Sequence, residues 1–133
     1  MKLLVAVLVL MNFRAAAQTH TETGALLPGG AYDNIYLQPL QSDSNVSGFV
    51  IWIKQEVKPH LHATHSENVF ILEGAGKMLL GGKTIEVKAG DLIYIPPQTV
   101  HALRVTSATP MKVLSIQAPE FDGKDRLFVD LAW

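Results

Sequence analysis

Short apolar runs separated by turn residues make up most of the chain after about residue 30. Apart from the N-terminal segment, no long window shows the 3.6-residue period of an amphipathic helix. The pair Gly81-Gly82 between two runs is typical of a two-residue hairpin loop. The pattern therefore predicts an all-β sandwich or barrel. The expected strands, rich in β-branched and aromatic residues, cover residues 34–37, 49–53, 69–72, 78–80, 84–87, 92–95, 102–105, 113–116 and 127–129.

The first 17 residues have the layout of a secretory signal peptide. Lys2 precedes an apolar run at residues 3–11, and Ala15 and Ala17 supply small side chains in the A-x-A pattern. The run is shorter than the roughly 20 apolar residues that a transmembrane helix needs. We expect cleavage after Ala17 and export to the periplasm or the medium, with no membrane attachment of the mature protein. A buried first strand is the alternative.

Composition favours one domain and excludes several kinds of site. Residues 18–30 are rich in Thr, Gly and Pro and predict an extended N-terminal arm, which leaves residues 31–133 as the β-domain. The 11 basic and 12 acidic side chains nearly balance, so no basic face for nucleic acid is expected. The chain has no cysteine, which excludes disulfides, thiolate metal sites and a cysteine nucleophile. Any metal ion must be bound by histidine and carboxylate.

Four of the five histidines lie between residues 60 and 101. His60 and His62 are two positions apart, so both side chains face the same side of a strand. Glu67 follows after a turn, and His101 lies on a later strand beyond a Pro-Pro corner. Imidazole suits first-row transition metals, and one carboxylate adds a negative charge. The alternative is a chance cluster of histidines around a polar loop.

Two longer motifs contain these residues. Residues 60–74 read H-x-H-x4-E-x6-G, and residues 90–101 read G-x5-P-x4-H. In this order they resemble the two motifs of the cupin superfamily, and the resemblance covers about residues 45–118. It identifies a small single-domain cupin, with one antiparallel barrel of the double-stranded β-helix (jelly-roll) type. The resemblance implies that a divalent transition-metal ion is bound by His60, His62, Glu67 and His101.

Three positions depart from the family pattern, and none of them is a ligand position. Lys54 and Gln98 stand where the pattern has glycine, and Val105 stands where it has asparagine. We expect Gln98 to line the mouth of the barrel. His65 is not part of the motif, and we expect it to be a solvent-facing loop residue. The alternative for His65 is an acid–base or supporting group beside the metal.

Other side chains are candidates for the barrel interior or for contact with a substrate. Tyr94, Gln98 and Arg104 are polar candidates for orienting a substrate. Strand alternation argues against Tyr94 and Arg104 as substrate contacts, because each is next to a residue that is expected to face the interior. The apolar candidates for the interior are Trp52, Phe70, Met78, Ile85, Ile93, Ile95 and Leu103.

The resemblance implies a metal-dependent enzyme that acts on a small, oxygen-rich molecule. Dioxygenation, sugar or uronate isomerisation and lyase chemistry all occur among small cupins. The metal could be Fe, Mn, Ni, Zn or Cu, because ligand identity alone does not select it. A non-catalytic module that binds metal or a small molecule is the alternative function. A homodimer is expected, with the runs at 34–37 and 49–53 as the candidate interface.

Overall fold

The computed structural model describes residues 19–133, so the expected signal peptide and Gln18 lie outside the described residues. Within this range the protein is built of strands, and no helix there is long and apolar enough to cross a membrane. One 3-10 turn, η1 (Thr23–Ala25), precedes the strands. The strands are β1 (Ile35–Asp43), β2 (Val46–Ile53), β3 (Glu56–His62), β4 (Ser66–Glu73), β5 (Ala75–Leu80), β6 (Lys83–Lys88), β7 (Leu92–Ile95), β8 (His101–Val105), β9 (Met111–Ala118) and β10 (Arg126–Phe128).

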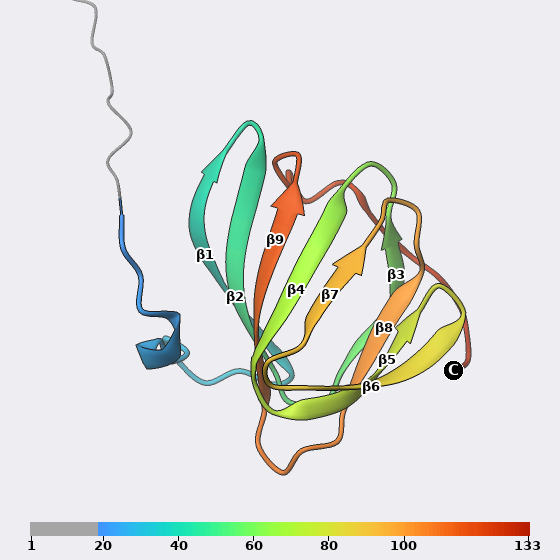
Figure 1. Ribbon diagram of the computed structural model, residues 1–133, viewed down its shortest axis with the longest axis horizontal. Helices are drawn as coiled ribbons and strands as arrows, with labels where there is room; N and C mark the ends of the chain where they lie inside the picture. Colours follow the sequence, from blue (N-terminus) through green and yellow to red (C-terminus); the bar gives the residue numbers. More distant parts are fainter. Residues whose placement is uncertain (1–18) are drawn as a thin grey trace, which may run out of the picture.

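These strands form two antiparallel sheets of five strands that face each other (Figure 1). One sheet has the order β1-β2-β9-β4-β7, and the other has the order β10-β3-β8-β5-β6. Consecutive strands such as β3 and β4 lie in different sheets, which is the jelly-roll arrangement. The predicted all-β class is therefore confirmed. Within the described residues no strand pairing joins the two sheets, so the barrel is not closed.

Two turns depend on glycine. Gly81 and Gly82 join β5 to β6 with φ of 56° and 85°, which is the left-handed pair that a type I′ hairpin requires. The predicted hairpin is thus confirmed. Gly74 separates β4 from β5 with φ of 86°. A Cβ there would lie 2.9 Å from the Met111 Cα, so this turn excludes every larger residue.

The core lies between the two sheets, and strand alternation decides which side chains reach it. In β4, Ile71 is buried and Val69 packs against the core, whereas Phe70 is 38% exposed on the opposite face. The interior position predicted for Phe70 is wrong because Glu67 on the same strand faces inward. The interior position predicted for Ile85 is also wrong, because this residue is 37% exposed on the edge strand β6. The confirmed core candidates are Met78, Ile93, Ile95 and Leu103.

Trp52 is buried, but it lies outside this core cluster. It alternates with the core residue Ile53 and packs edge-on against Tyr36, with ring centroids 5.7 Å apart. Its cross-strand partner Lys112 is also buried, and the Lys112 Nζ donates to the carbonyls of Gly24 and Leu26 at 3.0 and 2.9 Å. The N-terminal arm therefore covers this outer sheet face, and the interior position predicted for Trp52 is wrong.

The two runs expected at a dimer interface differ in their exposure. Strand β2 pairs with β1 on one side and with β9 on the other, and Phe49 and Val50 are buried. The run at 49–53 is therefore enclosed within the subunit. Strand β1 lies at the sheet edge, and Ile35 and Leu37 are partly exposed there. The homodimer stays a prediction, with β1 as its candidate edge.

Candidate metal centre

Three histidines converge inside the protein from two paired strands. His60 and His62 lie on β3, and His101 on β8 is the direct cross-strand partner of His60. All three are buried, and the ring centroids of His60 and His101 are 4.1 Å apart. One ring nitrogen from each lies within 4.8 Å of the other two. Strand alternation produces this cluster, because residues 60 and 62 share a face.

Backbone carbonyls fix two of the rings. The Nδ1 of His60 donates to the Lys58 carbonyl at 2.8 Å, and the Nδ1 of His101 donates to the Thr99 carbonyl at 2.9 Å. In a neutral imidazole this leaves the lone pair on Nε2. The Nε2 of His101 and both ring nitrogens of His62 are buried and have no hydrogen-bond partner. Leaving such groups unpaired costs free energy, and a metal ion would satisfy the His101 Nε2 and one ring nitrogen of His62.

Glu67 approaches the histidines from the other sheet. Its Oε2 lies 3.4 Å from the His101 Nε2 and 3.8 Å from the His62 Nε2. Its Oε1 accepts a hydrogen bond from the Ser115 hydroxyl and one at 3.5 Å from the Gln117 amide. Burial alone would raise the pKa of Glu67, but the contacts with His101 and Ser115 outweigh burial and lower it. The carboxylate is therefore ionised at neutral pH.

The environment keeps the rings of His60 and His62 neutral. Burial, followed by the neighbouring His101, lowers the pKa of His60 to about 3. Burial also lowers the pKa of His62, although Glu67 opposes this shift. Only a deprotonated imidazole can donate its lone pair to a metal. The structure thus brings the three predicted histidines within 4.8 Å of one another, with the Glu67 carboxylate beside His62 and His101.

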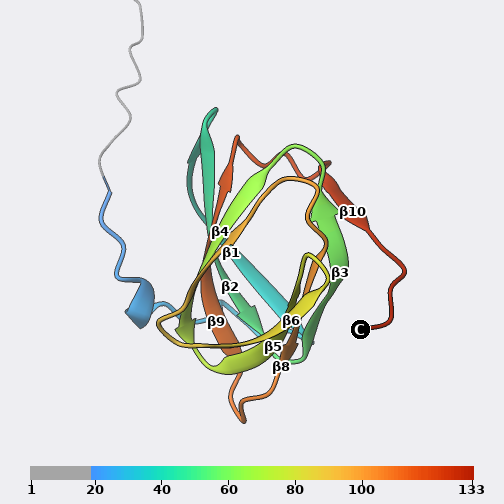
Figure 2. The ribbon, with the colours of Figure 1, turned by 45° about the vertical axis from the view of Figure 1, so that its right-hand side comes forward.

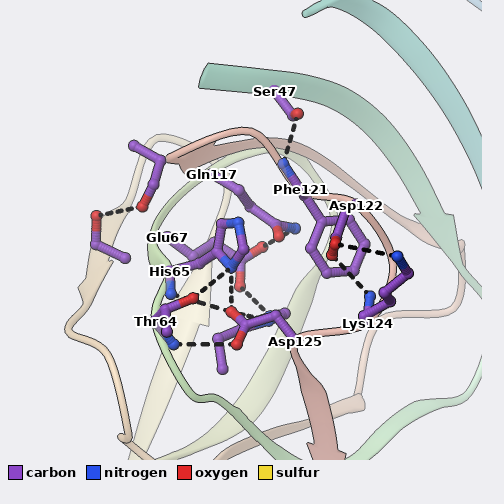
Figure 3. A network of polar contacts seen from close by, with 12 residues as sticks. Ser47, Thr64, His65, Glu67, Gln117, Phe121, Asp122, Lys124 and Asp125 are labelled. Atoms are coloured by element: carbon purple, nitrogen blue, oxygen red, sulfur yellow. Dashed lines mark hydrogen bonds and ion pairs between the residues drawn. The ribbon is translucent and has the colours of Figure 1, made fainter. Parts of the chain in front are cut away.

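His65 is buried, so the solvent-facing position expected for it is wrong. Its Nδ1 donates to an Asp125 oxygen (Figure 3), and its Nε2 donates to the Glu120 carbonyl at 2.7 Å. Because both nitrogens donate, this ring is an imidazolium. Burial alone would lower the pKa of His65, but the bonds to Glu120 and Asp125 outweigh it and raise the pKa. His65 therefore has a structural partner beside the centre.

Asp125 holds the turn that connects the ligand strands. Its two oxygens accept the backbone N–H groups of Thr64 and His65, each at 3.0 Å. Burial alone would raise the pKa of Asp125, but the bonds from His65 and Thr64 together outweigh burial and lower the pKa to about 2. Its Oδ2 also lies 3.8 Å from the His62 Nδ1. The C-terminal segment thus fixes the turn between His62 and Glu67.

Sequence reasoning missed several residues around the centre. Ser115 and Gln117 continue the inward alternation of Met111 and Val113 along β9, so a period-two pattern could have placed both inside. Asp125 lies in a segment without periodicity, and no local signal points to it. Its contacts arise only from the tertiary fold.

An internal cavity of about 100 Å³ adjoins the centre. Aliphatic side chains from both sheets form most of its wall, and His60, Glu67, His101 and Arg126 are its charged or titratable lining residues. A small molecule in this cavity would therefore meet an apolar wall and the proposed ligands together.

The three polar candidates for substrate contact do not line this cavity. Tyr94 is 56% exposed on the outer face. The Arg104 guanidinium lies 4.5 Å from the Trp133 ring centroid, away from the histidines. Gln98 is exposed, and its backbone N–H donates to the His62 carbonyl at 2.6 Å. Its φ of 63° explains why the family pattern has glycine there.

Comparison with known proteins places this arrangement in a family. Residues 49–117 match the family described as Cupin domain, and this stretch contains all four candidate ligands. The chain belongs to the cupin family. It is 36% identical over 102 residues to an uncharacterized protein of Aquifex aeolicus, covering 77% of this cupin and 84% of that protein.

Two further relatives show how far the likeness extends. This cupin is 31% identical over 72 residues to quercetin 2,3-dioxygenase of Bacillus subtilis, which covers 50% of this chain and 21% of that enzyme. A solved Klebsiella pneumoniae protein with a double-stranded beta-helix domain superposes with a TM-score of 0.70 at 17% identity, covering 87% of this chain and 100% of that one. That structural likeness shows the fold alone. The histidine cluster of this cupin could hold a metal ion.

Proposed function

We propose that this cupin is a metal-dependent enzyme that acts on a small, oxygen-rich molecule. A divalent transition-metal ion would be held by His60, His62, Glu67 and His101. The observation that carries the proposal is the cluster of three buried histidines, with one ring nitrogen from each within 4.8 Å of the others. Ring nitrogens of His62 and His101 have no hydrogen-bond partner, and His60 and His101 line a cavity. Three imidazoles and one carboxylate suit Fe, Mn, Ni, Zn or Cu.

When bound, the ion supplies Lewis-acid polarisation of a substrate oxygen. The protein's own residues prepare the site for this chemistry. Hydrogen bonds to backbone carbonyls orient His60 and His101, and Ser115 and Gln117 hold the Glu67 carboxylate. The aliphatic walls exclude water, which strengthens electrostatic interactions inside. The match to a dioxygenase supports an oxygen-dependent reaction, with isomerisation and lyase chemistry as further candidates.

A binding module without turnover is the second candidate function, and one observation favours it. Among the described residues that line the cavity, the titratable ones other than Arg126 are those assigned to the metal. Glu67 is held by two hydrogen bonds, and an arginine stays protonated. A reaction that needs a separate general base would therefore lack one in this cavity.

Elemental analysis of protein made without an affinity tag tests the metal assignment. Wild-type protein is expected to hold about one ion per chain, while His60→Ala, His101→Ala and Glu67→Gln lose at least about tenfold in metal affinity. His20→Ala is the matched control, because His20 is an exposed residue of the N-terminal arm. Circular dichroism checks that each variant keeps its strands. Full metal content in His60→Ala or His101→Ala contradicts the assignment, as does metal-free wild-type protein.

Turnover assays on the metal-loaded protein then separate the two candidate functions. Oxygen uptake and ketonisation of unsaturated uronates are measured for the wild type, with His60→Ala as the blank. Turnover that disappears in His60→Ala supports an enzyme. Stoichiometric binding of metal or small molecule, without turnover in either assay, supports the binding module.

A further inference from the structure

Arg126 is a cationic residue that faces the cavity and is not one of the proposed metal ligands. It lies on β10, directly opposite His62 on β3, and Figure 2 shows β10 running along β3 at the edge of its sheet. Directly paired residues share a sheet face, so Arg126 points to the same side as His62. It lines the cavity together with His60, Glu67 and His101.

The Arg126 side chain has no polar partner that would explain its position. Its Nε is buried without a hydrogen-bond acceptor, and within residues 19–133 no carboxylate forms an ion pair with its guanidinium. The neighbouring acids are occupied, since Asp125 binds His65 and Glu67 binds Ser115. Its guanidinium carbon lies 5.9 Å from the Phe121 ring centroid, so an aromatic ring borders it.

The charge of Arg126 opposes the binding of a cation beside it. Its guanidinium borders the same cavity as three of the proposed ligands, so Coulomb repulsion disfavours a divalent ion there. With that ion bound, the positive charge of Arg126 and the negative charge of Glu67 cancel, so the centre carries a net charge of about +2. An anionic ligand would relieve this repulsion.

The cavity limits the size and character of that ligand. Its volume is about 100 Å³, whereas a dry cavity of about 150 Å³ accommodates benzene. The ligand therefore has about six heavy atoms or fewer inside the cavity. The wall includes Val69, Ile71 and Ile95, which favour a short aliphatic part. A guanidinium binds a carboxylate through two parallel N–H donors.

We infer that Arg126 binds the carboxylate of a short aliphatic 2-oxo or 2-hydroxy acid in this cavity. The second oxygen of such an acid lies on the carbon next to the carboxylate, and it would be enclosed in the same cavity that His60 and His101 line. This inference rests on the proposed function, because it places the acid beside the proposed metal centre. It narrows the substrate class from oxygen-rich molecules in general to small acids.

Isothermal titration of the zinc-loaded protein with pyruvate and pyruvamide tests the inference. The two probes have similar shapes, but only pyruvate carries a negative charge. Wild-type protein is expected to bind pyruvate at least about tenfold more tightly. Arg126→Met should lose about 10- to 100-fold in pyruvate affinity and bind both probes equally. Arg126→Lys keeps the charge without the paired donors, and about a fivefold loss for pyruvate alone is expected.

Controls separate this inference from the proposed function. Arg104→Met removes an outward guanidinium and should leave pyruvate binding unchanged. Metal content is measured on every sample and should equal that of the wild type. If the wild type takes up neither zinc nor Fe, Mn, Ni or Cu, the proposed function fails together with this inference. If it takes up zinc but does not prefer pyruvate, the inference alone is overturned. Unchanged pyruvate binding in both Arg126 variants also overturns it, as does tighter binding of inorganic phosphate than of pyruvate.

Discussion

Asp125→Asn tests whether the C-terminal segment holds the turn between two proposed ligands. Asp125 accepts the backbone N–H groups of Thr64 and His65 and the His65 ring N–H. Asparagine preserves the shape and one acceptor oxygen, so the Thr64 bond can persist. It replaces the other oxygen by an NH₂ group that faces two donors of His65. The substitution therefore removes two charge-assisted hydrogen bonds and the buried ion pair.

The expected loss follows from these contacts. Hydrogen bonds to charged groups contribute about 1.5–3 kcal/mol each, with partial overlap when they share one acceptor. We therefore expect Asp125→Asn to lower the free energy of unfolding by about 2–4 kcal/mol. Urea unfolding of metal-free protein, followed by circular dichroism, measures this difference. Asp122→Asn is the matched control in the same loop, because Asp122 is exposed and accepts one backbone bond from Lys124. Its expected effect is under about 0.5 kcal/mol.

The same pair predicts how the difference depends on pH. The folded pKa of Asp125 is lowered from 3.8 to about 2, so its contribution is present above pH 3.8 and is lost as the pH falls toward 2. The pKa of His65 is raised above 6.5. Its contribution is complete below 6.5 and is lost as the pH rises through the raised value. The difference between wild type and Asp125→Asn should thus be largest between about pH 4 and 6.5. A difference under about 0.5 kcal/mol at pH 5, or one that does not vary with pH, refutes the reasoning.

Four further predictions concern other parts of the chain. Lys112→Met removes the cation that binds Gly24, Leu26 and Glu73; it should lower the free energy of unfolding by about 1–3 kcal/mol and expose the arm to limited proteolysis. Gln98→Gly relieves a positive φ of 63° and should raise the free energy of unfolding by up to about 1 kcal/mol. The urea midpoint should therefore rise, and a lower midpoint contradicts this. Mass spectrometry of the exported protein should show a chain that begins at Gln18, and retention of Met1 contradicts the signal peptide. Mass measurement in solution at micromolar concentration should give a dimer, and a monomer refutes that prediction.

Much of the fold could be predicted from the sequence because its strands follow local rules. The Gly81-Gly82 hairpin and the short apolar runs depend on residues that are neighbours in the chain. The positions of Phe70 and Trp52 outside the core could not be predicted from hydrophobicity alone. Both sheet faces are partly apolar, since the N-terminal arm covers the outer face beside Trp52. Phe70 could have been corrected by parity, because Glu67 on the same strand had already been assigned to the interior.

The residues of the candidate site also fall into those that the sequence predicts and those that it does not. The spacing of His60 and His62 follows from strand geometry, and the motifs add Glu67 and His101. The C-terminal partners could not be found in this way, because β10 has three residues and shows no period. Asp125 comes directly before β10, and Arg126 is the first residue of that strand. One reaches the turn at His65, and the other reaches the cavity. The register of β10 on β3 fixes both positions, since a shift by one residue would place Asp125 or Leu127 opposite His62 in place of Arg126.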